Sequence, residues 1–172
     1  FQSTESRIAA VYFDDGAGGG RVIGNVFYRV GHPRFGAIFV HGGHDHIFEN
    51  NIFVECKRVF GNSPWPDQRW NEYVAAELWQ KRLTREVDIT QPPYITKYPE
   101  LKGFLESARR PRINRGLKNV VYKCDTFSVP EYELKDNFVT EEDPGFVDPE
   151  RLKFQLRDNS LVYQRIPGFE RI

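Results

Sequence analysis

The sequence predicts an all-β chain wound as a parallel β-helix with an α-helical insertion, and three observations lead to this fold class. Residues 22–30 (VIGNVFYRV) and 48–56 (FENNIFVEC) repeat at an offset of 26 residues, which aligns Asn25 with Asn51. Residues 119–124 (NVVYKC) carry a third copy of the segment from asparagine to cysteine. Runs of β-branched and aromatic residues alternate with glycine-rich turns, which favours strands over a helical bundle. Such a period suits coils that stack about 4.8 Å apart, so that equivalent residues become neighbours.

The first strands of the repeat are residues 11–14 and 38–41. Their spacing is one residue longer than the offset of 26 that relates the later strands. Side chains alternate between the two faces of a strand. Tyr12 and Asp14 are therefore expected to face outward beside Phe39 and His41. The interior is expected to hold Val11, Phe13, Val26, Ile38, Val40, Ile52 and Val120. An antiparallel sandwich containing two hairpins that resemble each other by chance is the alternative fold.

The repeated asparagines and cysteines occupy equivalent places in the predicted coils. Asparagine hydrogen-bonds neighbouring backbone and tolerates left-handed geometry, so we expect Asn25, Asn51 and Asn119 to form a structural ladder at one corner. Cys56 and Cys124 are expected to stack as buried free thiols, with a disulfide as the alternative if their coils are adjacent.

A helical insertion is predicted between the second and third copies, over residues 57–118. Residues 70–83 (WNEYVAAELWQKRL) show an apolar stripe at helical spacing, and a second helix is expected near Pro99. After residue 124 the periodicity fades, and residues 154–170 are expected to close the end of the solenoid, whose strand edges need cover. Residues 1–172 then form the C-terminal part of one β-helix domain.

Composition limits the classes of partner. The chain has 172 residues with 24 Lys+Arg and 24 Asp+Glu, so a net charge of zero argues against nucleic acid. No run of about 18 to 20 apolar residues is present, so no membrane span is expected. The two cysteines do not fix a redox compartment, and the oligomeric state stays open.

Three strings carry a resemblance to a known class of protein. They are AAVYFDDGAGGGRVIGNVFYRVG, HGGHDHIFENNIFVEC and DPGFVDPERLKFQLRDNSLVYQRIPGFERI. They resemble the C-terminal half of bacterial right-handed parallel β-helix proteins that act on carbohydrates, a group including glycoside hydrolases and polysaccharide lyases. The resemblance implies a right-handed solenoid, earlier coils beyond this chain that contribute to the active site, and a secreted or periplasmic location.

Asp14, Asp15 and His41 are the candidate catalytic residues. Hydrolysis of a glycosidic bond needs two carboxyl groups, one protonated and one ionised, and Asp14 and Asp15 are the best local candidates. His41 is in register with Asp14 and is a candidate base or substrate ligand. The alternative is that Asp-Asp-Gly forms only a turn.

Tyr12, Phe39, His44, Asp45 and Trp65 are the candidate substrate-binding residues, because sugar rings stack on aromatic rings and their hydroxyls bind acids and amides. The cluster at residues 41–46 lacks the i, i+4 spacing of helical zinc sites, so no metal site is expected there. No cofactor is expected. Calcium at Glu141, Glu142, Asp143 and Asp148 is the alternative to a polar loop at those residues.

The predicted function is cleavage of glycosidic linkages in a polysaccharide or oligosaccharide, by hydrolysis with a carboxylate pair. A polysaccharide lyase acting on uronates is the second choice, with His41, Lys57 and Arg58 supplying the base and cations. A β-helix that binds glycans without cleaving them is the third.

Overall fold

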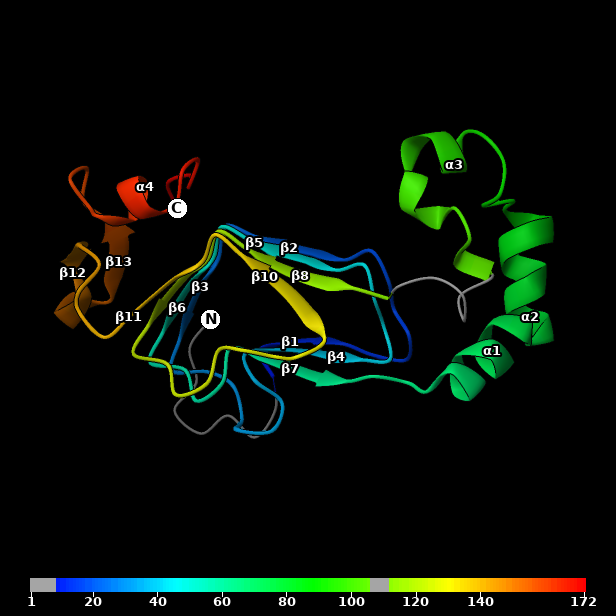
Figure 1. The fold of residues 1–172 in the computed structure, drawn as a ribbon, viewed down its shortest axis with the longest axis horizontal. Coiled ribbons are helices and arrows are strands. Elements are labelled where there is room, and N and C mark those ends of the chain that lie inside the picture. The colour runs from blue at the N-terminus through cyan, green and yellow to red at the C-terminus, as the bar shows by residue number, and fades with distance from the viewer. Residues whose placement is uncertain (1–8, 106–111) are drawn as a thin grey trace. The chain divides into compact units, whose positions relative to one another are not determined.

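The computed structural model describes residues 9–105 and 112–172, and it shows an all-β chain with few helices. The strands that form the sheets are β1 (Val11–Phe13), β2 (Arg21–Ile23), β3 (Val26–Tyr28), β4 (Ile38–His41), β5 (Ile47–Glu49), β6 (Ile52–Val54), β7 (Phe60–Ser63), β8 (Asn114–Leu117), β9 (Val120–Tyr122), β10 (Tyr132–Lys135) and β11 (Phe138–Thr140). They make three parallel sheets, ordered β1-β4-β7, β2-β5-β8-β10 and β3-β6-β9-β11 (Figure 1). Each of three successive passages of the chain therefore adds one strand to each sheet in turn, and β10 and β11 then extend two of the sheets.

The strand register confirms that the sequence repeat is a repeat in space. Val26 pairs with Ile52 in parallel, which is the predicted offset of 26 residues. Val11 pairs with Ile38, as the alignment one residue out of step requires. Matching positions in the repeat are thus neighbours on adjacent strands.

Two segments that the repeat did not identify also belong to the sheets. The strand β7 pairs with β4, and its glycine and polar residues hid it inside the predicted insertion. The strands β10 and β11 pair with β8 and β9, so the periodicity does not end at residue 124. Asn137 stands directly before β11, as Asn119 stands directly before β9. This match in the sequence could have identified the additional strand.

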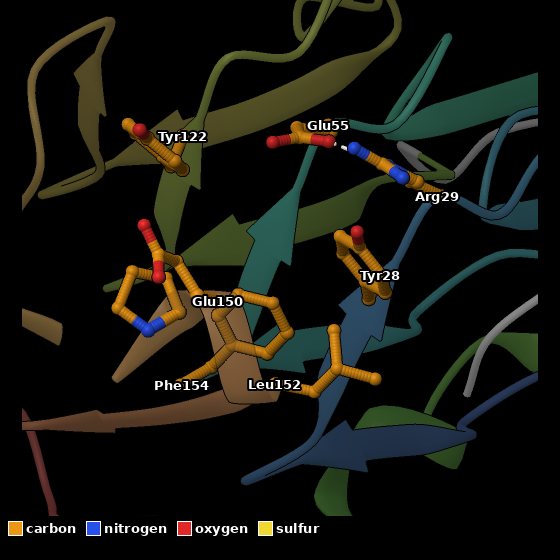
Figure 2. Close-up of a pocket in the computed structure, with 8 residues that line it drawn as sticks. Tyr28, Arg29, Glu55, Tyr122, Glu150, Leu152 and Phe154 are labelled. Carbon is orange, nitrogen blue, oxygen red and sulfur yellow. Dashed lines mark hydrogen bonds and ion pairs between the residues drawn. The ribbon is translucent and has the colours of Figure 1, made fainter. Parts of the chain in front are cut away.

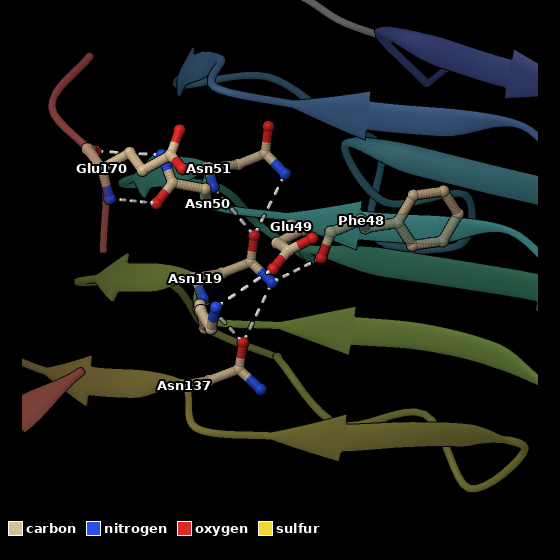
Figure 3. A network of polar contacts seen from close by, with 8 residues as sticks. Phe48, Glu49, Asn50, Asn51, Asn119, Asn137 and Glu170 are labelled. Atoms are coloured by element: carbon tan, nitrogen blue, oxygen red, sulfur yellow. Dashed lines mark hydrogen bonds and ion pairs between the residues drawn. The ribbon is translucent and has the colours of Figure 1, made fainter. Parts of the chain in front are cut away.

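Asn25, Asn51, Asn119 and Asn137 form a continuous hydrogen-bonded ladder at one corner. Figure 3 shows Asn51, Asn119 and Asn137 of this ladder. The backbone N–H of Asn51 donates to Asn119 Oδ1 at 3.0 Å, and its Nδ2 donates to the same oxygen and to the carbonyl of Val22. Asn51 Oδ1 in turn accepts the backbone N–H of Asn25. Asn51 and Asn119 are fully buried, so the ladder satisfies backbone groups that water cannot reach.

Phenylalanine side chains form the centre of the core. The rings of Phe27 and Phe53 stack with centroids 4.8 Å apart, and Phe48 and Phe60 pack in the same cluster. Ile38 and Val40 lie in this cluster as predicted. The predicted interior placement of Val26, Ile52 and Val120 is wrong, because these residues pack in a second cluster.

The second cluster exists because the C-terminal segment covers the other face of the sheet β3-β6-β9. This segment contains β12 (Phe146–Asp148), the 3-10 turn η4 (Pro149–Arg151), β13 (Lys153–Leu156) and α4 (Val162–Arg165). Phe146, Phe154 and Ile166 pack there against Ile52 and Val120. Because apolar residues are buried on both faces of this sheet, the alternation of side chains along a strand does not show which face lines the interior. The C-terminal segment thus covers a face of the sheet. The prediction that it caps the end of the solenoid is wrong.

The helical unit spans Pro64–Arg112, and residues 106–111 of it lie outside the described part. It contains α1 (Asp67–Ala75), α2 (Glu77–Gln80), the π-helix η1 (Lys81–Glu86), α3 (Tyr94–Lys97) and the 3-10 turn η2 (Pro99–Leu101). The predicted helix over 70–83 is divided at Ala76, whose ψ is 138°. The predicted bounds of 57 and 118 were too wide, because β7 and β8 lie outside the unit and pair within the sheets.

Cys56 and Cys124 are free thiols that follow the paired strands β6 and β9, and the Cys56 backbone N–H donates to Cys124 Sγ at 3.3 Å. This confirms the prediction of stacked free thiols, and Cys56 is buried as predicted, whereas Cys124 is only half-buried. Among the described residues, no helix has the length and apolar character needed to cross a membrane.

Candidate active site

Asp14, Asp15 and His41 meet where the sheet β1-β4-β7 ends. His41 Nδ1 lies 2.8 Å from Asp14 Oδ1 and 3.8 Å from Asp15 Oδ1. The side chain of His41 is 24% exposed, whereas those of Asp14 and Asp15 are 62% and 74% exposed. Two carboxylates and one imidazole are thus open to solvent at one point.

A tight turn directs both carboxylates to the same histidine. The strand β1 ends at Phe13, and Asp15 has a left-handed φ of 45°, so the alternation of faces stops before the pair. The Asp15 backbone N–H donates to Asp14 Oδ1 at 2.9 Å, and the Gly16 N–H donates to the carbonyl of His41 at 3.0 Å. The Asp-Asp-Gly segment is therefore a turn, as the alternative required, and it still gathers both acids beside His41.

An aromatic surface adjoins the three residues. The Tyr12 and Phe39 rings have centroids 4.9 Å apart, as predicted from their register, and Phe35 meets Phe39 edge-on. Tyr12 is 45% exposed, but Phe39 is only 4% exposed and cannot itself offer a ring to a substrate. Partial desolvation, followed by the charges of Asp14 and Asp15, raises the pKa of Tyr12.

The predicted contact of His44 and Asp45 with substrate does not match their burial. His44 is 1% exposed, and its Nδ1 lies 2.8 Å from Asp45 Oδ2. The Asp45 side chain is 15% exposed, and its residue has a left-handed φ of 62°. The sequence did not reveal this because a cluster of polar residues in a loop usually indicates exposure.

His46 is fully buried among aromatic rings. The ring of Phe13 lies 4.2 Å away between centroids, and the Gly20 backbone N–H donates to His46 Nδ1 at 2.9 Å. Burial lowers the pKa of His46 below 6.5, because the charged imidazolium is poorly solvated there. This histidine is therefore neutral in the folded protein at neutral pH.

The lowered pKa of His46 predicts a specific loss of stability in acid. The unfolded chain binds a proton at His46 below about pH 6.5 while the folded chain resists it, so stability falls as the pH drops. The loss is expected to approach about 1.4 kcal/mol per pH unit below that value. Urea unfolding from pH 7 to pH 5 measures it against His46→Gln, whose curve should be flatter. Parallel curves for the two proteins would contradict the assignment.

The burial of Trp65 does not match its predicted role as a substrate-binding residue. Trp65 is 6% exposed in the core of the helical unit, packed edge-on against Tyr73 and covered by the Arg69 guanidinium at 4.0 Å. Its buried ring is not presented for stacking on a sugar. Lys57 forms an exposed ion pair with Asp125 at 3.5 Å.

The three residues Asp14, Asp15 and His41 also have the donor set of a cation site, since one ligand atom from each lies within 4.8 Å of the others. Within residues 9–105 and 112–172, no such convergence of three donors is found in the acidic loop considered for calcium. There, Asp143 Oδ1 accepts the N–H groups of Gly145 and Phe146, which is the geometry of a polar loop.

A pocket of about 460 Å³ lies on a different sheet, and the sequence reasoning missed it (Figure 2). Its lining residues are Tyr28, Arg29, Glu55, Tyr122, Pro149, Glu150, Leu152 and Phe154. Tyr28 and Tyr122 each stand three residues after an asparagine of the ladder. This shared spacing could have shown from the sequence that the two tyrosines lie on one face.

In comparisons with known proteins, no protein family, curated protein or solved structure matches the chain.

Proposed function

We propose that this chain is part of a right-handed parallel β-helix that cleaves glycosidic bonds by hydrolysis. The parallel register of the three sheets supports the solenoid, because three successive passages of the chain each add one strand to each sheet. The convergence of Asp14, Asp15 and His41 beside the exposed ring of Tyr12 is the observation that supports the chemistry.

Each residue has a role in this proposal. Asp14, which accepts hydrogen bonds from the Asp15 backbone and from His41, acts in its ionised form. Asp15, the second acid of the pair, is assigned the role of general acid at the leaving oxygen. Tyr12 stacks on a sugar ring, and His41 positions the Asp14 carboxylate.

The spacing of the two acids favours retention of configuration. One oxygen of each acid lies within 4.8 Å of the other, which is less than the roughly 6.5–9.5 Å between carboxyl groups that leaves room for water in inverting enzymes. Asp14 then attacks the anomeric carbon while the glycosidic C–O bond breaks and Asp15 protonates the leaving oxygen. Water next cleaves the glycosyl ester, giving its proton to Asp15 and releasing Asp14.

A polysaccharide lyase is the second candidate, and the contact of 2.8 Å between His41 and Asp14 favours it. The Asp14 carboxylate orients the imidazole through Nδ1, so His41 is the candidate base that removes the proton α to a uronate carboxylate. The Arg34 guanidinium, 5.6 Å from the centre of the nearby Phe35 ring, would neutralise the substrate's carboxylate.

Incubation of the protein with neutral and uronate-containing polysaccharides tests both candidates. Hydrolysis yields new reducing ends without ultraviolet absorbance, and NMR of the first product should show the original anomeric configuration. Elimination yields reducing ends together with the absorbance of an unsaturated uronate, and it would replace hydrolysis by the second candidate. Binding without new reducing ends would contradict both and leave a glycan-binding β-helix.

A further inference from the structure

We propose that the pocket beside Tyr28 and Tyr122 is a binding site for an uncharged sugar unit, separate from the Asp14, Asp15 and His41 cluster. The two sites belong to different sheets: Asp14 follows β1, whereas Tyr28 and Tyr122 end β3 and β9. The proposal does not rest on the proposed cleavage, since a sugar can bind here whether or not the chain cuts glycans.

The sheet itself holds the two tyrosines apart on one face. Tyr28 pairs with Val54, which pairs with Tyr122, so the two rings stand two strand spacings apart, or about 10 Å. Val54, the residue between them, is smaller and leaves room. Phe154 of the C-terminal segment is buried below, with its ring 4.9 Å from that of Tyr28. The result is a space with aromatic walls and an apolar floor.

Charged groups stand around this aromatic space. Arg29 Nε donates to Glu55 Oε2 at 2.6 Å, and Figure 2 shows this pair near Tyr28, with Glu150 on the other side of the view. Both Arg29 and Glu55 have left-handed φ values, of 50° and 53°, because each follows the last residue of its strand at a repeated corner. The side chains of this pair are 59% and 34% exposed, so both remain accessible to a ligand.

The lining selects the chemistry of the ligand. Among the lining residues Arg29 contributes one positive charge and Glu55 and Glu150 contribute two negative charges, which sum to −1, and the Lys123 ammonium lies beside the lining, 5.0 Å from the centre of the Tyr122 ring. A phosphate or a uronate would meet two carboxylates in the lining, whose one guanidinium is already paired with Glu55. A purely apolar ligand would desolvate the charged groups without replacing their hydrogen bonds. A sugar suits both the aromatic and the charged parts of the lining. Its C–H faces stack on tyrosine, and its hydroxyls bind carboxylate and guanidinium.

The size of the pocket agrees with a small ligand. Its volume of about 460 Å³ lies within the roughly 300–1,000 Å³ typical of small-molecule sites. Leu152, which is 48% exposed, adds an apolar edge from the C-terminal segment. That segment therefore has a second use besides covering the core, because it supplies Glu150, Leu152 and Phe154 to the pocket.

Ligand-observed NMR with maltose, cellobiose, lactose and digalacturonate tests the proposal in an Asp14→Asn background. This background removes the proposed cleavage, so binding is read independently of whether cleavage occurs. We expect millimolar binding of at least one neutral disaccharide, with digalacturonate at least tenfold weaker. Shifts of the Tyr28 and Tyr122 ring resonances should accompany binding.

Two variants and one control place the ligand in the pocket. Tyr122→Ala should weaken binding by tenfold or more, whereas Tyr98→Ala, which truncates an exposed tyrosine in the helical unit, should leave it unchanged. Glu150→Lys changes the net charge of the lining from −1 to +1 at an exposed position that the fold does not need, so it tests the site even if Tyr122→Ala fails to fold. It should improve digalacturonate binding relative to the neutral sugar by roughly tenfold. Absence of neutral-sugar binding, tighter binding of digalacturonate by the protein with Glu150 intact, or binding that is indifferent to Glu150→Lys would overturn the proposal.

Discussion

Replacing Asp14 by asparagine is expected to lower kcat for glycan cleavage by a factor of about 10³, with the fold retained. Removal of a positioned acid or base typically costs about 10²–10⁴ in rate, and the neutral amide could neither attack the anomeric carbon nor hold His41 as a carboxylate does. The side chain is 62% exposed, so the change should shift the free energy of unfolding by less than about 0.5 kcal/mol. Steady-state kinetics and urea unfolding measure the two effects.

Asp136→Asn is the matched control for this experiment. Like Asp14, Asp136 is an exposed aspartate that directly follows a strand, here β10, but it belongs to a different corner. Its replacement should leave kcat within about twofold of the parent protein. If Asp14→Asn keeps full activity with either class of substrate, Asp14 has no part in the chemistry and the proposed mechanism fails.

Replacing Asn51 by alanine is expected to lower the free energy of unfolding by about 3 kcal/mol or more. The side chain accepts from Asn25 and donates to Val22 and Asn119, all from a fully buried position. Alanine would leave the Asn25 N–H and the Val22 carbonyl without these partners, and each buried unsatisfied group costs about 1–3 kcal/mol. Urea denaturation followed by circular dichroism measures the loss.

The matched control for Asn51 lies at the end of the same ladder. Asn137 accepts from Asn119 and donates to the Gly116 carbonyl, but it is only half-buried, so water can replace part of what is lost and Asn137→Ala should cost less than Asn51→Ala. A loss at Asn51 smaller than at Asn137, or below about 1 kcal/mol, would mean that the ladder does not stabilise the stack of strands.

The strand register could be predicted because the ladder leaves a mark in the sequence. An asparagine that bonds to its counterpart on the next turn must recur at the length of one turn, and Asn25 and Asn51 do so. The same regularity placed Tyr12 beside Phe39 and Asp14 beside His41. Asn137 continued the pattern at a shorter spacing, and for that reason it was missed.

Burial was harder to predict than register. His44 lies in a polar loop of the sequence, yet the fold encloses it, whereas Tyr12 belongs to a strand and stays 45% exposed. The position of the Asp15 carboxylate depends on one backbone angle. The left-handed φ of Asp15 directs this carboxylate toward His41, whereas a continuing strand would have placed it on the other face of the sheet.

By itself, the sequence determined which residues of neighbouring turns become neighbours, because stacking identical turns requires the same side chains to recur at the length of a turn. Only the tertiary structure decided which face of each strand is interior and where a pocket opens. Phe27 and Val26 are both apolar, and packing of Phe154 and Phe146 from the distant C-terminal segment buries the face that bears Val26. A sheet covered on both sides carries apolar residues on both sides, so the pattern of one strand cannot distinguish its core from its cover.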